Sequence, residues 1–262
     1  MRLALLIGDV QLAEALSGLL QGVGHAIHGF DQEQKLRRAL TRESFDLVLA
    51  DGALLGEDCA AFVQRIRPVP GTELPVMLIN CVDDETRLSE ALAAGAEDYI
   101  SRPLAGRELV GRIAAVLRRR HPDLFRLEAE LTFGSYRFDL QARTVWLRGE
   151  VIDLTEREFD LALFLFRNVG RMISRGHIHE MIWQVSRPME SRTIDTHVSR
   201  LRRKLALLRG NEFHLSAVYG TGYRLERSRQ PWVSQLVTIP MEEPGDTALP
   251  GQSSSGVQVC SA

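Results

Sequence analysis

Four polar residues follow short apolar runs in the first half of the 262-residue chain: Asp9, Asp51, Asn80 and Arg102. If the runs are strands of an open parallel sheet, the four side chains meet at the sheet edge where ligands bind. Two carboxylates at close range favour a hard cation such as Mg²⁺, and a carboxylate can attack a phosphoryl donor. An amide and a guanidinium can then bind the phosphoryl oxygens. Each residue alone would be an ordinary loop residue, but four in consecutive expected positions favour a pocket.

A second candidate surface lies on a helix predicted over residues 192–208. Apolar residues recur at spacings of four, three, four and three, which predicts a buried stripe: Ile194, Val198, Leu201, Leu205 and Leu208. The opposite face carries polar and basic residues: Thr193, Thr196, His197, Arg200, Arg203 and Lys204. A helix of this kind fits the major groove of DNA, where Arg can bind guanine edges and Lys or Thr can bind phosphates. A solvated amphipathic helix is the alternative interpretation.

The elements that must position the first four residues alternate between strand and helix. The predicted strands are Leu3–Ile7, His25–Phe30, Asp46–Ala50, Pro75–Ile79 and Asp98–Ser101. The predicted helices are Val10–Leu20, Gln32–Leu40, Glu57–Ile66, Asp84–Ala94 and Leu104–Arg118. Five such units predict a doubly wound parallel sheet over residues 1–118, with α/β flavodoxin-like architecture.

The second half has a different pattern. A polar segment over residues 119–130 predicts a linker, and alternation over 131–152 predicts a small antiparallel sheet. Thr155 and Glu158 form a capping box that opens a helix to Arg167, and Ser174 caps the next helix. The basic helix and a hairpin around Gly220 complete an α+β winged helix-turn-helix domain over residues 131–228. Residues 229–262 are rich in Pro, Ser and Gly and predict a disordered tail.

Composition excludes several classes of protein. No apolar run approaches the ~20 residues that cross a bilayer, and three scattered cysteines argue against a disulfide framework and fit a reducing cytoplasm. The net charge of −2 hides an asymmetry: residues 1–118 carry an excess of acidic side chains and residues 131–228 an excess of basic ones. Only the second half is therefore expected to contact a polyanion. No nucleophile triad is evident, so we expect no enzyme.

Residues 1–120 resemble the receiver domain of bacterial two-component response regulators. The segment from Phe45 to Asp51 looks like the strand that carries the phosphoacceptor, and the segment from Gly95 to Leu104 looks like the one that ends in the Lys-Pro of the family. The resemblance implies that Asp51 is the phosphoacceptor, that Asp9 and Asp51 hold Mg²⁺, and that Tyr99 is the aromatic switch residue. It also implies a homodimer face with Asp98, Glu108 and Arg112.

The chain departs from that family in its pocket. The family has two adjacent acids after the first strand, where Gly8-Asp9 keeps one. It has Ser or Thr where Asn80 stands, Lys where Arg102 stands, and Pro where Leu55 stands. A missing carboxylate weakens Mg²⁺ binding, and Arg does not replace Lys at a tight site. Asp51 is therefore either phosphorylated slowly or by a dedicated sensor histidine kinase, or the receiver is atypical and acts through protein contacts. We favour the second.

Residues 131–228 resemble the winged-helix domain of the OmpR/PhoB class. The matching motifs are Leu154–Phe159, Arg192–Leu205 and Tyr219–Leu225. The resemblance implies that residues 192–208 form the recognition helix, with Arg192 among its DNA contacts, and that residues 185–190 contact RNA polymerase. The wing of the family carries Arg at the position of Tyr219, so we expect altered minor-groove contacts, with Arg224 or Arg227 at most a partial substitute.

We therefore predict a cytoplasmic, DNA-binding regulator of transcription whose receiver controls dimerisation. The alternatives are a signalling or scaffold protein whose winged helix binds protein, and a regulator that works independently of phosphorylation. An enzyme on the parallel sheet is disfavoured because no catalytic constellation accompanies the acidic residues.

Overall fold

The computed structural model describes residues 1–66, 74–81, 85–101, 103–125, 128–183 and 191–228, with the main chain alone at residues 57, 81, 191 and 192. The predicted tail, Arg102 and the loop at 185–190 lie outside the described residues. Among the helices of the described segments, none has both the length and the apolar character that a membrane span requires.

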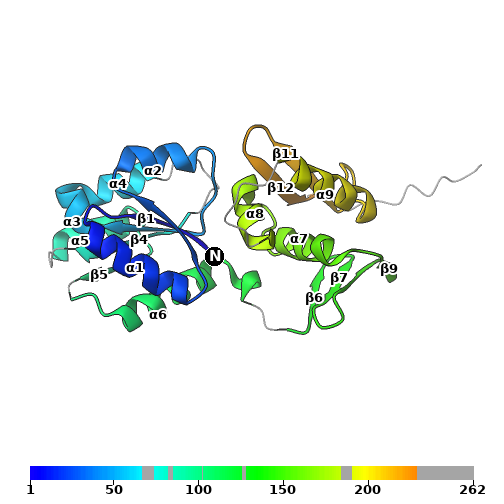
Figure 1. Ribbon diagram of the computed structural model, residues 1–262, viewed down its shortest axis with the longest axis horizontal. Helices are drawn as coiled ribbons and strands as arrows, with labels where there is room; N and C mark the ends of the chain where they lie inside the picture. Colours follow the sequence, from blue (N-terminus) through cyan, green and yellow to red (C-terminus); the bar gives the residue numbers. More distant parts are fainter. Residues whose placement is uncertain (67–73, 82–84, 102, 126–127, 184–190, 229–262) are drawn as a thin grey trace, which may run out of the picture. The chain divides into compact units, whose positions relative to one another are not determined.

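Five parallel strands form the sheet of the N-terminal domain, in the order β2-β1-β3-β4-β5 (Figure 1). They are β1 (Arg2–Leu6), β2 (Ala26–Phe30), β3 (Leu47–Asp51), β4 (Val76–Cys81) and β5 (Asp98–Ser101). β1 and β3 are buried along their whole length, which explains the apolar runs Leu3–Leu6 and Leu47–Ala50 within them. The predicted flavodoxin-like sheet is confirmed, with strand bounds within two residues of those expected.

Helices cover both faces of this sheet. They are α1 (Val10–Gly22), α2 (Glu33–Leu40), α3 (Gly52–Leu55), the 3₁₀ turn η1 (Gly56–Asp58), α4 (Cys59–Ile66), α5 (Glu85–Ala93) and α6 (Gly106–Arg120). Leu3 and Leu5 pack with α1 and α6, whereas Ala4 and Leu6 pack with α2, α4 and α5. The helix predicted over 57–66 is preceded by an additional short helix, because Asp51 caps α3 and Gly56 adopts a φ of 59°.

The C-terminal domain begins after the 3₁₀ turn η2 (Pro122–Leu124), and its described residues form a four-stranded sheet, three helices and a three-stranded sheet (Figure 1). The first sheet contains β6 (Glu130–Phe133), β7 (Tyr136–Asp139), β8 (Thr144–Leu147) and β9 (Glu150–Ile152). Then follow α7 (Glu156–Phe166), β10 (Met172–Ser174), α8 (Arg175–Trp183), α9 (Ser191–Lys204), β11 (Phe213–Val218) and β12 (Gly222–Arg227). The winged helix-turn-helix fold is confirmed.

Two predicted caps are present in this domain. Thr155 Oγ1 accepts from the Glu158 N–H at 3.3 Å, and the Glu158 carboxylate accepts from the Thr155 N–H at 3.0 Å. Ser174 Oγ accepts from the N–H of His177 at 3.1 Å at the start of α8. Each bond satisfies an N–H that the helix leaves unpaired, so both helix starts are fixed by their own sequence.

The helix α9 ends four residues before the predicted Leu208. Ala206 adopts a left-handed φ of 50° and turns the chain. Leu207 is consequently buried and Leu208 is 54% exposed, so the prediction that Leu208 belongs to the buried stripe is wrong. Ile194, Val198, Leu201 and Leu205 are all at most 3% exposed, as expected.

We predict that Gly222→Ala destabilises the chain and that Gly18→Ala stabilises it. A Cβ at Gly222 would overlap the carbonyl oxygen of Ile173 on the neighbouring β10, so we expect a loss of about 2–3 kcal/mol in the free energy of unfolding. A Cβ at Gly18, inside α1, meets nothing within 4 Å, and the change should add about 0.5–1 kcal/mol. Denaturant unfolding measures both, and equal effects of the two changes would contradict the prediction.

Candidate functional site

The exposed side of α9 is the first candidate site. The apolar stripe packs into the C-terminal core, and this fixes which side of the helix faces away from it. Arg200 and Arg203 lie on the outer side and are exposed. Among the described residues, neither guanidinium has a hydrogen-bond or ion-pair partner. Both are therefore available to bind an anion without first breaking an internal contact.

The other predicted residues of this face differ in exposure. Thr196 is exposed, whereas Thr193 and His197 are half-buried. The His197 ring lies against Trp183 of α8, with centroids 5.4 Å apart, and burial lowers the pKa of its imidazole. His197 is therefore a packing residue as well as a candidate contact. Arg192 belongs to α9, but its side chain lies outside the described part of the chain.

Lys204 has an internal role that the sequence did not reveal. Its Nζ lies 2.8 Å from Glu158 Oε2 and donates to the Asp153 carbonyl at 2.9 Å. Glu158 is 1% exposed and is the acidic member of the capping box. Burial would raise the pKa of the Glu158 carboxyl, but the Lys204 ammonium and the Thr155 N–H outweigh that effect and lower it. Lys204 thus joins the end of α9 to the start of α7.

The start of α9 is fixed by a second set of contacts. The Tyr223 hydroxyl of β12 donates to Asp195, and Arg175 Nε of α8 donates to the same carboxylate at 3.3 Å. Burial and Asp195 together raise the pKa of Tyr223 to about 12, so the phenol stays a donor at neutral pH. Asp195 and Tyr223 stand inside sequence motifs noted above, but nothing in those motifs indicated that they contact each other.

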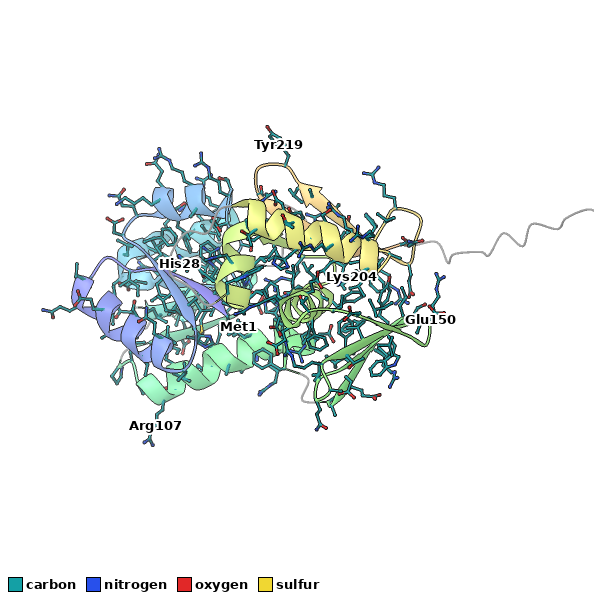
Figure 2. All side chains as sticks on the ribbon, turned by 45° about the vertical axis from the view of Figure 1, so that its right-hand side comes forward. Met1, His28, Arg107, Glu150, Lys204 and Tyr219 are labelled. Carbon is teal, nitrogen blue, oxygen red and sulfur yellow. The ribbon has the colours of Figure 1, made fainter. Side chains whose placement is uncertain are left out.

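The hairpin β11–β12 presents one aromatic side chain at its tip. Tyr219 is fully exposed and projects away from the domain (Figure 2). Gly220 beside it has a φ of 70°, which makes the tight turn. Arg224 lies within β12, 3.8 Å from Glu226, and Arg227 pairs with Glu212 at 3.1 Å. Neither arginine belongs to the turn, so Tyr219 is the large side chain of the tip.

The predicted acidic pocket brings Asp51 and Asn80 together at the ends of β3 and β4. Asn80 Nδ2 donates to Asp51 Oδ1 at 2.8 Å, and the Ala53 N–H donates to the same oxygen at 3.0 Å. Both side chains are at most 4% exposed. Asn80 has a φ of 56° at a register shift of β4, and Asn is one of the few side-chain residues that tolerates this conformation.

The residues around Asp51 fit a tight Mg²⁺ site poorly. Asp9 caps α1 by accepting from the Leu12 N–H at 3.0 Å. A Cβ at Gly8 would lie only 3.0 Å from Leu54 Cδ1, so an apolar side chain borders the position of the missing acid. No group of three metal-ligating side chains occurs among the residues that the structure describes. With glycine in place of that acid and a leucine beside it, the site offers a cation one carboxylate fewer than the family does.

The remaining predicted residues of the N-terminal domain lie on or near β5. Tyr99 is half-buried and packs against the core formed with α4 and α5. Arg112 Nε donates to Glu108 at 2.8 Å and Nη1 to Asp98 at 3.2 Å, so the three predicted dimer residues pair within one chain. These ion pairs are exposed, and a second copy could exchange them at small cost.

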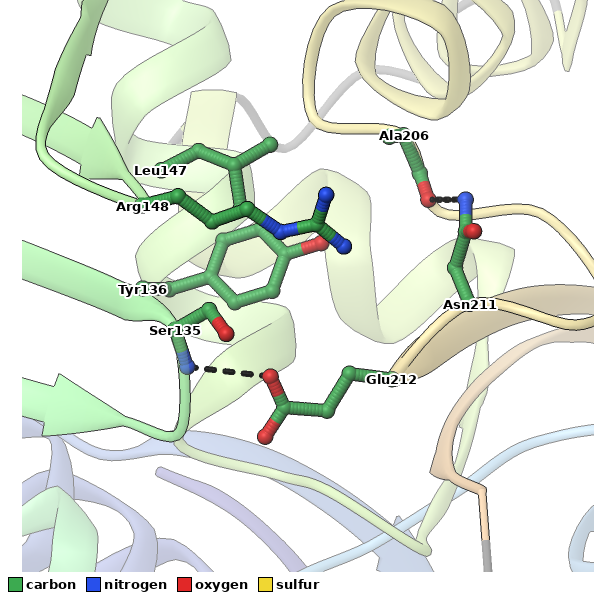
Figure 3. Close-up of a pocket in the computed structure, with 7 residues that line it drawn as sticks. All are labelled: Ser135, Tyr136, Leu147, Arg148, Ala206, Asn211 and Glu212. Atoms are coloured by element: carbon green, nitrogen blue, oxygen red, sulfur yellow. Dashed lines mark hydrogen bonds between the residues drawn. The ribbon is translucent and has the colours of Figure 1, made fainter. Parts of the chain in front are cut away.

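A small cavity of about 80 Å³ lies between the turn after β6 and the loop after α9 (Figure 3). Ser135 donates its N–H to Glu212 at 3.0 Å, and Asn211 Nδ2 donates to the Ala206 carbonyl at 2.6 Å. The cavity has room for only a few water molecules. We interpret the hydrogen bonds around this cavity as contacts that hold the loop after α9 in place.

Comparisons with known proteins agree with both halves of the structure. The family model of the response regulator receiver domain matches residues 5–114, and that of the transcriptional regulatory protein C terminal matches residues 149–225. The sensory transduction protein RegX3 of Mycobacterium tuberculosis (strain ATCC 25618 / H37Rv) is 33% identical over 83% of this chain and 96% of its own. The phosphate regulon transcriptional regulatory protein PhoB of Rhizobium meliloti (strain 1021) is 32% identical over 84% of this chain and 98% of its own. In the crystal structure of the response regulator DrrB, a Thermotoga maritima OmpR/PhoB homolog, the protein has 26% sequence identity to this chain. The match covers 86% of this chain and 98% of DrrB, with a TM-score of 0.37.

We predict that Lys204→Met lowers the free energy of unfolding by about 1–3 kcal/mol, because it leaves the buried Glu158 carboxylate without its cation. Arg203→Met is the matched control on the same helix, and it should change stability by less than about 0.5 kcal/mol. Denaturant unfolding of the two variants tests the assignment. Equal stability of both variants would show that the Lys204 ammonium has no structural role.

Proposed function

This chain belongs to the OmpR/PhoB class of two-component response regulators, and we propose that it binds DNA through the outer side of α9 while its receiver works without phosphoryl transfer. Members of this class regulate transcription through their C-terminal domain, and the chain matches the family in both domains. Regulators of this kind are typically not enzymes, and we propose the same for this chain. We also propose that it acts in the cytoplasm.

The observation that carries the proposal is a pair of guanidinium groups on α9 that have no partner within the described segments of the chain. The buried stripe holds the helix in the domain, and Arg200 and Arg203 extend from the other side. An arginine can bind the O6 and N7 atoms of guanine in a bidentate manner or neutralise a phosphate. We propose that the same DNA groove is also contacted by Thr193, Thr196, His197 and Arg192, whose side chain lies outside the described part of the chain. Lys204 is committed to Glu158 and is proposed only as a peripheral phosphate contact.

The wing is proposed to approach the minor groove with Tyr219 in place of the arginine of the family. A phenol carries no positive charge, so it gains nothing from the negative potential of a narrow minor groove. Its ring and hydroxyl can still contact sugar and phosphate groups. Arg224 stands within β12 beside Glu226, which limits its ability to substitute.

The receiver pocket supports a role without phosphoryl transfer. Asp51 is buried and already accepts two hydrogen bonds, one from Asn80 and one from the main chain. Leu54 borders the place of the second acid, so any Mg²⁺ would bind weakly. Under this proposal a sensor histidine kinase is dispensable, and Arg102 and Tyr99 are not part of a phosphorylation switch.

Membership of the OmpR/PhoB class also suggests partners other than DNA. We propose a homodimer through the face that carries Asp98, Glu108 and Arg112, because paired half-sites on DNA suit a two-fold symmetric protein. We propose that residues 185–190, which lie outside the described part, contact RNA polymerase. The division into a receiver (1–118), a linker (119–130), a winged helix (131–228) and a tail (229–262) is part of this proposal.

The DNA-binding proposal predicts that Arg200→Ala with Arg203→Ala weakens duplex binding by at least about tenfold. The double change should also make the slope of log affinity against log salt less negative, by about one for each phosphate that the protein no longer neutralises. A gel shift at several salt concentrations measures both, with a duplex selected by the wild-type chain from a random pool. Arg107→Ala, an exposed arginine of the receiver, is the matched control. An unchanged affinity would favour the alternative in which the winged helix binds protein.

The receiver proposal predicts that acetyl phosphate and Mg²⁺ add no phosphoryl group to the purified chain, as measured by intact-mass spectrometry. Gly8→Asp combined with Leu54→Ala restores the acid and removes the neighbouring apolar side chain, so this variant should bind Mg²⁺ more tightly in calorimetry. A mass increase in the wild type that Asp51→Ala abolishes would overturn the proposal.

A further inference from the structure

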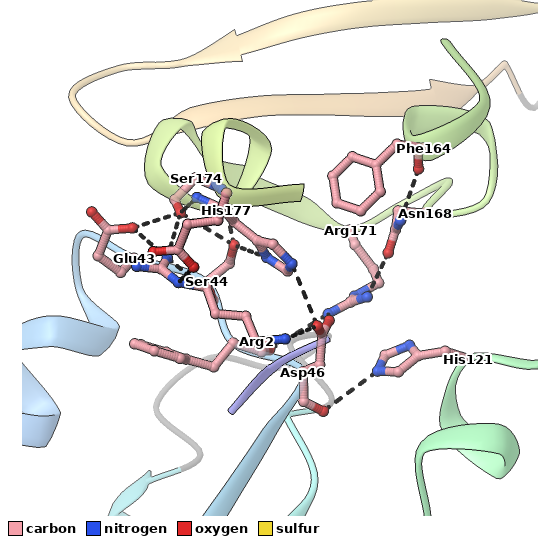
Figure 4. A network of polar contacts seen from close by, with 12 residues as sticks. Arg2, Glu43, Ser44, Asp46, His121, Phe164, Asn168, Arg171, Ser174 and His177 are labelled. Atoms are coloured by element: carbon pink, nitrogen blue, oxygen red, sulfur yellow. Dashed lines mark hydrogen bonds and ion pairs between the residues drawn. The ribbon is translucent and has the colours of Figure 1, made fainter. Parts of the chain in front are cut away.

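A cluster of polar side chains joins the two domains at the edge of the receiver sheet where the strands begin (Figure 4). Arg2, Ser44 and Asp46 stand at the starts of β1 and β3. Arg171, Ser174 and His177 come from the segment around β10 and the first turn of α8. We call these six residues the dock.

Asp46 is the centre of the dock. Its Oδ2 accepts from the Arg2 N–H at 2.7 Å, and its Oδ1 accepts from Arg171 Nη2 at 2.9 Å. His177 Nε2 lies 3.4 Å from Oδ2, at ion-pair distance but without hydrogen-bond geometry. Burial alone would raise the pKa of the Asp46 carboxyl, but His177, Arg171 and the Arg2 N–H lower it well below its usual value. The carboxylate is therefore held in its charged form by groups from both domains.

Two serines complete the contact. Ser44 Oγ accepts from the Ser174 N–H at 2.9 Å, lies 2.9 Å from His177 Nδ1, and is 3.4 Å from Ser174 Oγ. Ser174 Oγ in turn donates to Glu43 at 2.7 Å, and the same carboxylate accepts from Arg2 Nη1 at 2.6 Å. The hydroxyl that caps α8 is thus also a contact to the receiver.

The burial of these groups makes the contact specific. Arg2, Ser44, Asp46, Ser174 and His177 are all at most 9% exposed. A buried ion pair adds little net stability, but a shifted arrangement would leave a charge buried without its partner, which is strongly unfavourable. The network therefore favours one relative orientation of the two contacting surfaces over orientations that differ slightly from it.

The dock lies away from both binding faces. It is at the beginnings of the strands, whereas Asp51 is at the end of β3, five residues beyond Asp46 and so about 17 Å along the strand at about 3.3 Å per residue. Arg200 and Arg203 remain exposed, and so do Arg112 and Glu108 on the predicted dimer face. The docked arrangement therefore covers neither the groove-binding side of α9 nor the receiver face proposed for pairing.

We infer that the docked arrangement is itself the DNA-binding form, so that the dock holds the two domains as one unit and does not have to open. This inference rests on the proposed function and adds its mode of regulation. A receiver that transfers no phosphoryl group needs another way to determine where its DNA-binding domain lies, and a fixed contact at the opposite edge provides it. Activity then depends on the pairing of already docked chains.

A disulfide across the dock tests the inference in the full-length chain. Ser44→Cys with Ser174→Cys replaces two hydroxyls that are 3.4 Å apart, and the longer C–S bonds bring the sulfur atoms nearer to disulfide distance. Peptide mapping identifies the cross-link, so the native cysteines can stay. We expect the cross-link to form readily under mild oxidation. The oxidised and reduced forms should bind the selected duplex with affinities within about twofold, because no opening step is required.

Three results would count against the inference. A failure of the two introduced thiols to cross-link would mean that the dock is not formed in solution. An oxidised form that binds at least about tenfold more weakly, with recovery after reduction, would mean that the dock is inhibitory. A wild-type chain that selects no duplex at all would overturn the proposed function, whereas the yield of the cross-link would still report on the dock.

A second variant tests whether the network aligns the domains. Arg171→Gln removes the cation that bridges to Asp46, so it should slow the formation of the cross-link between the two introduced thiols by about tenfold. Arg209→Gln, at an exposed arginine after α9, is the matched control and should leave the rate unchanged. Equal rates in both backgrounds would show that the ion network does not determine the orientation.

Discussion

The packing of one side of α9 into the C-terminal core is the constraint on which the rest of this structure depends. Three apolar side chains of the helix, and Leu205 directly after it, are almost fully buried, and the contacts of Lys204 and Asp195 fix its two ends against α7 and β12. Because the inner side is fixed in this way, the outer side is determined without any further contact. This packing determines the direction in which the two exposed arginines point. A helix that could rotate about its axis would present them in no defined direction.

The receiver sheet uses its two edges for different purposes. In an open parallel sheet the ends of the strands form the usual ligand site, and in this chain that edge holds a buried carboxylate, an amide and a neighbouring leucine. The opposite edge carries the denser polar network, which reaches into the C-terminal domain. Buried charge is thus concentrated at the edge where the two domains meet, and not at the edge where a phosphoryl group would bind.

Much of the fold could be predicted from the sequence, because short-range patterns encode it. Short apolar segments, several of them nearly continuous, located the five strands of the receiver, and Thr155 with Glu158 identified the start of α7. The three-residue strand β10 was missed, since it is too short to show alternation. The end of α9 was placed too late, because a left-handed residue at Ala206 breaks the apolar spacing without any glycine or proline to signal it. The contacts of Lys204 and Arg171 join residues 46 and 125 positions apart, and no local pattern encodes such pairs.

The involvement of Arg2 has a practical consequence for work with this protein. Its main-chain N–H and its guanidinium both belong to the buried network, and the preceding carbonyl of Met1 accepts from the N–H of Ala26. Affinity tags and fluorescent fusions are commonly attached to the first residue of a recombinant chain. In this protein such an attachment would emerge beside the contact between the domains, and a purification handle there could alter the behaviour that it is meant to help measure.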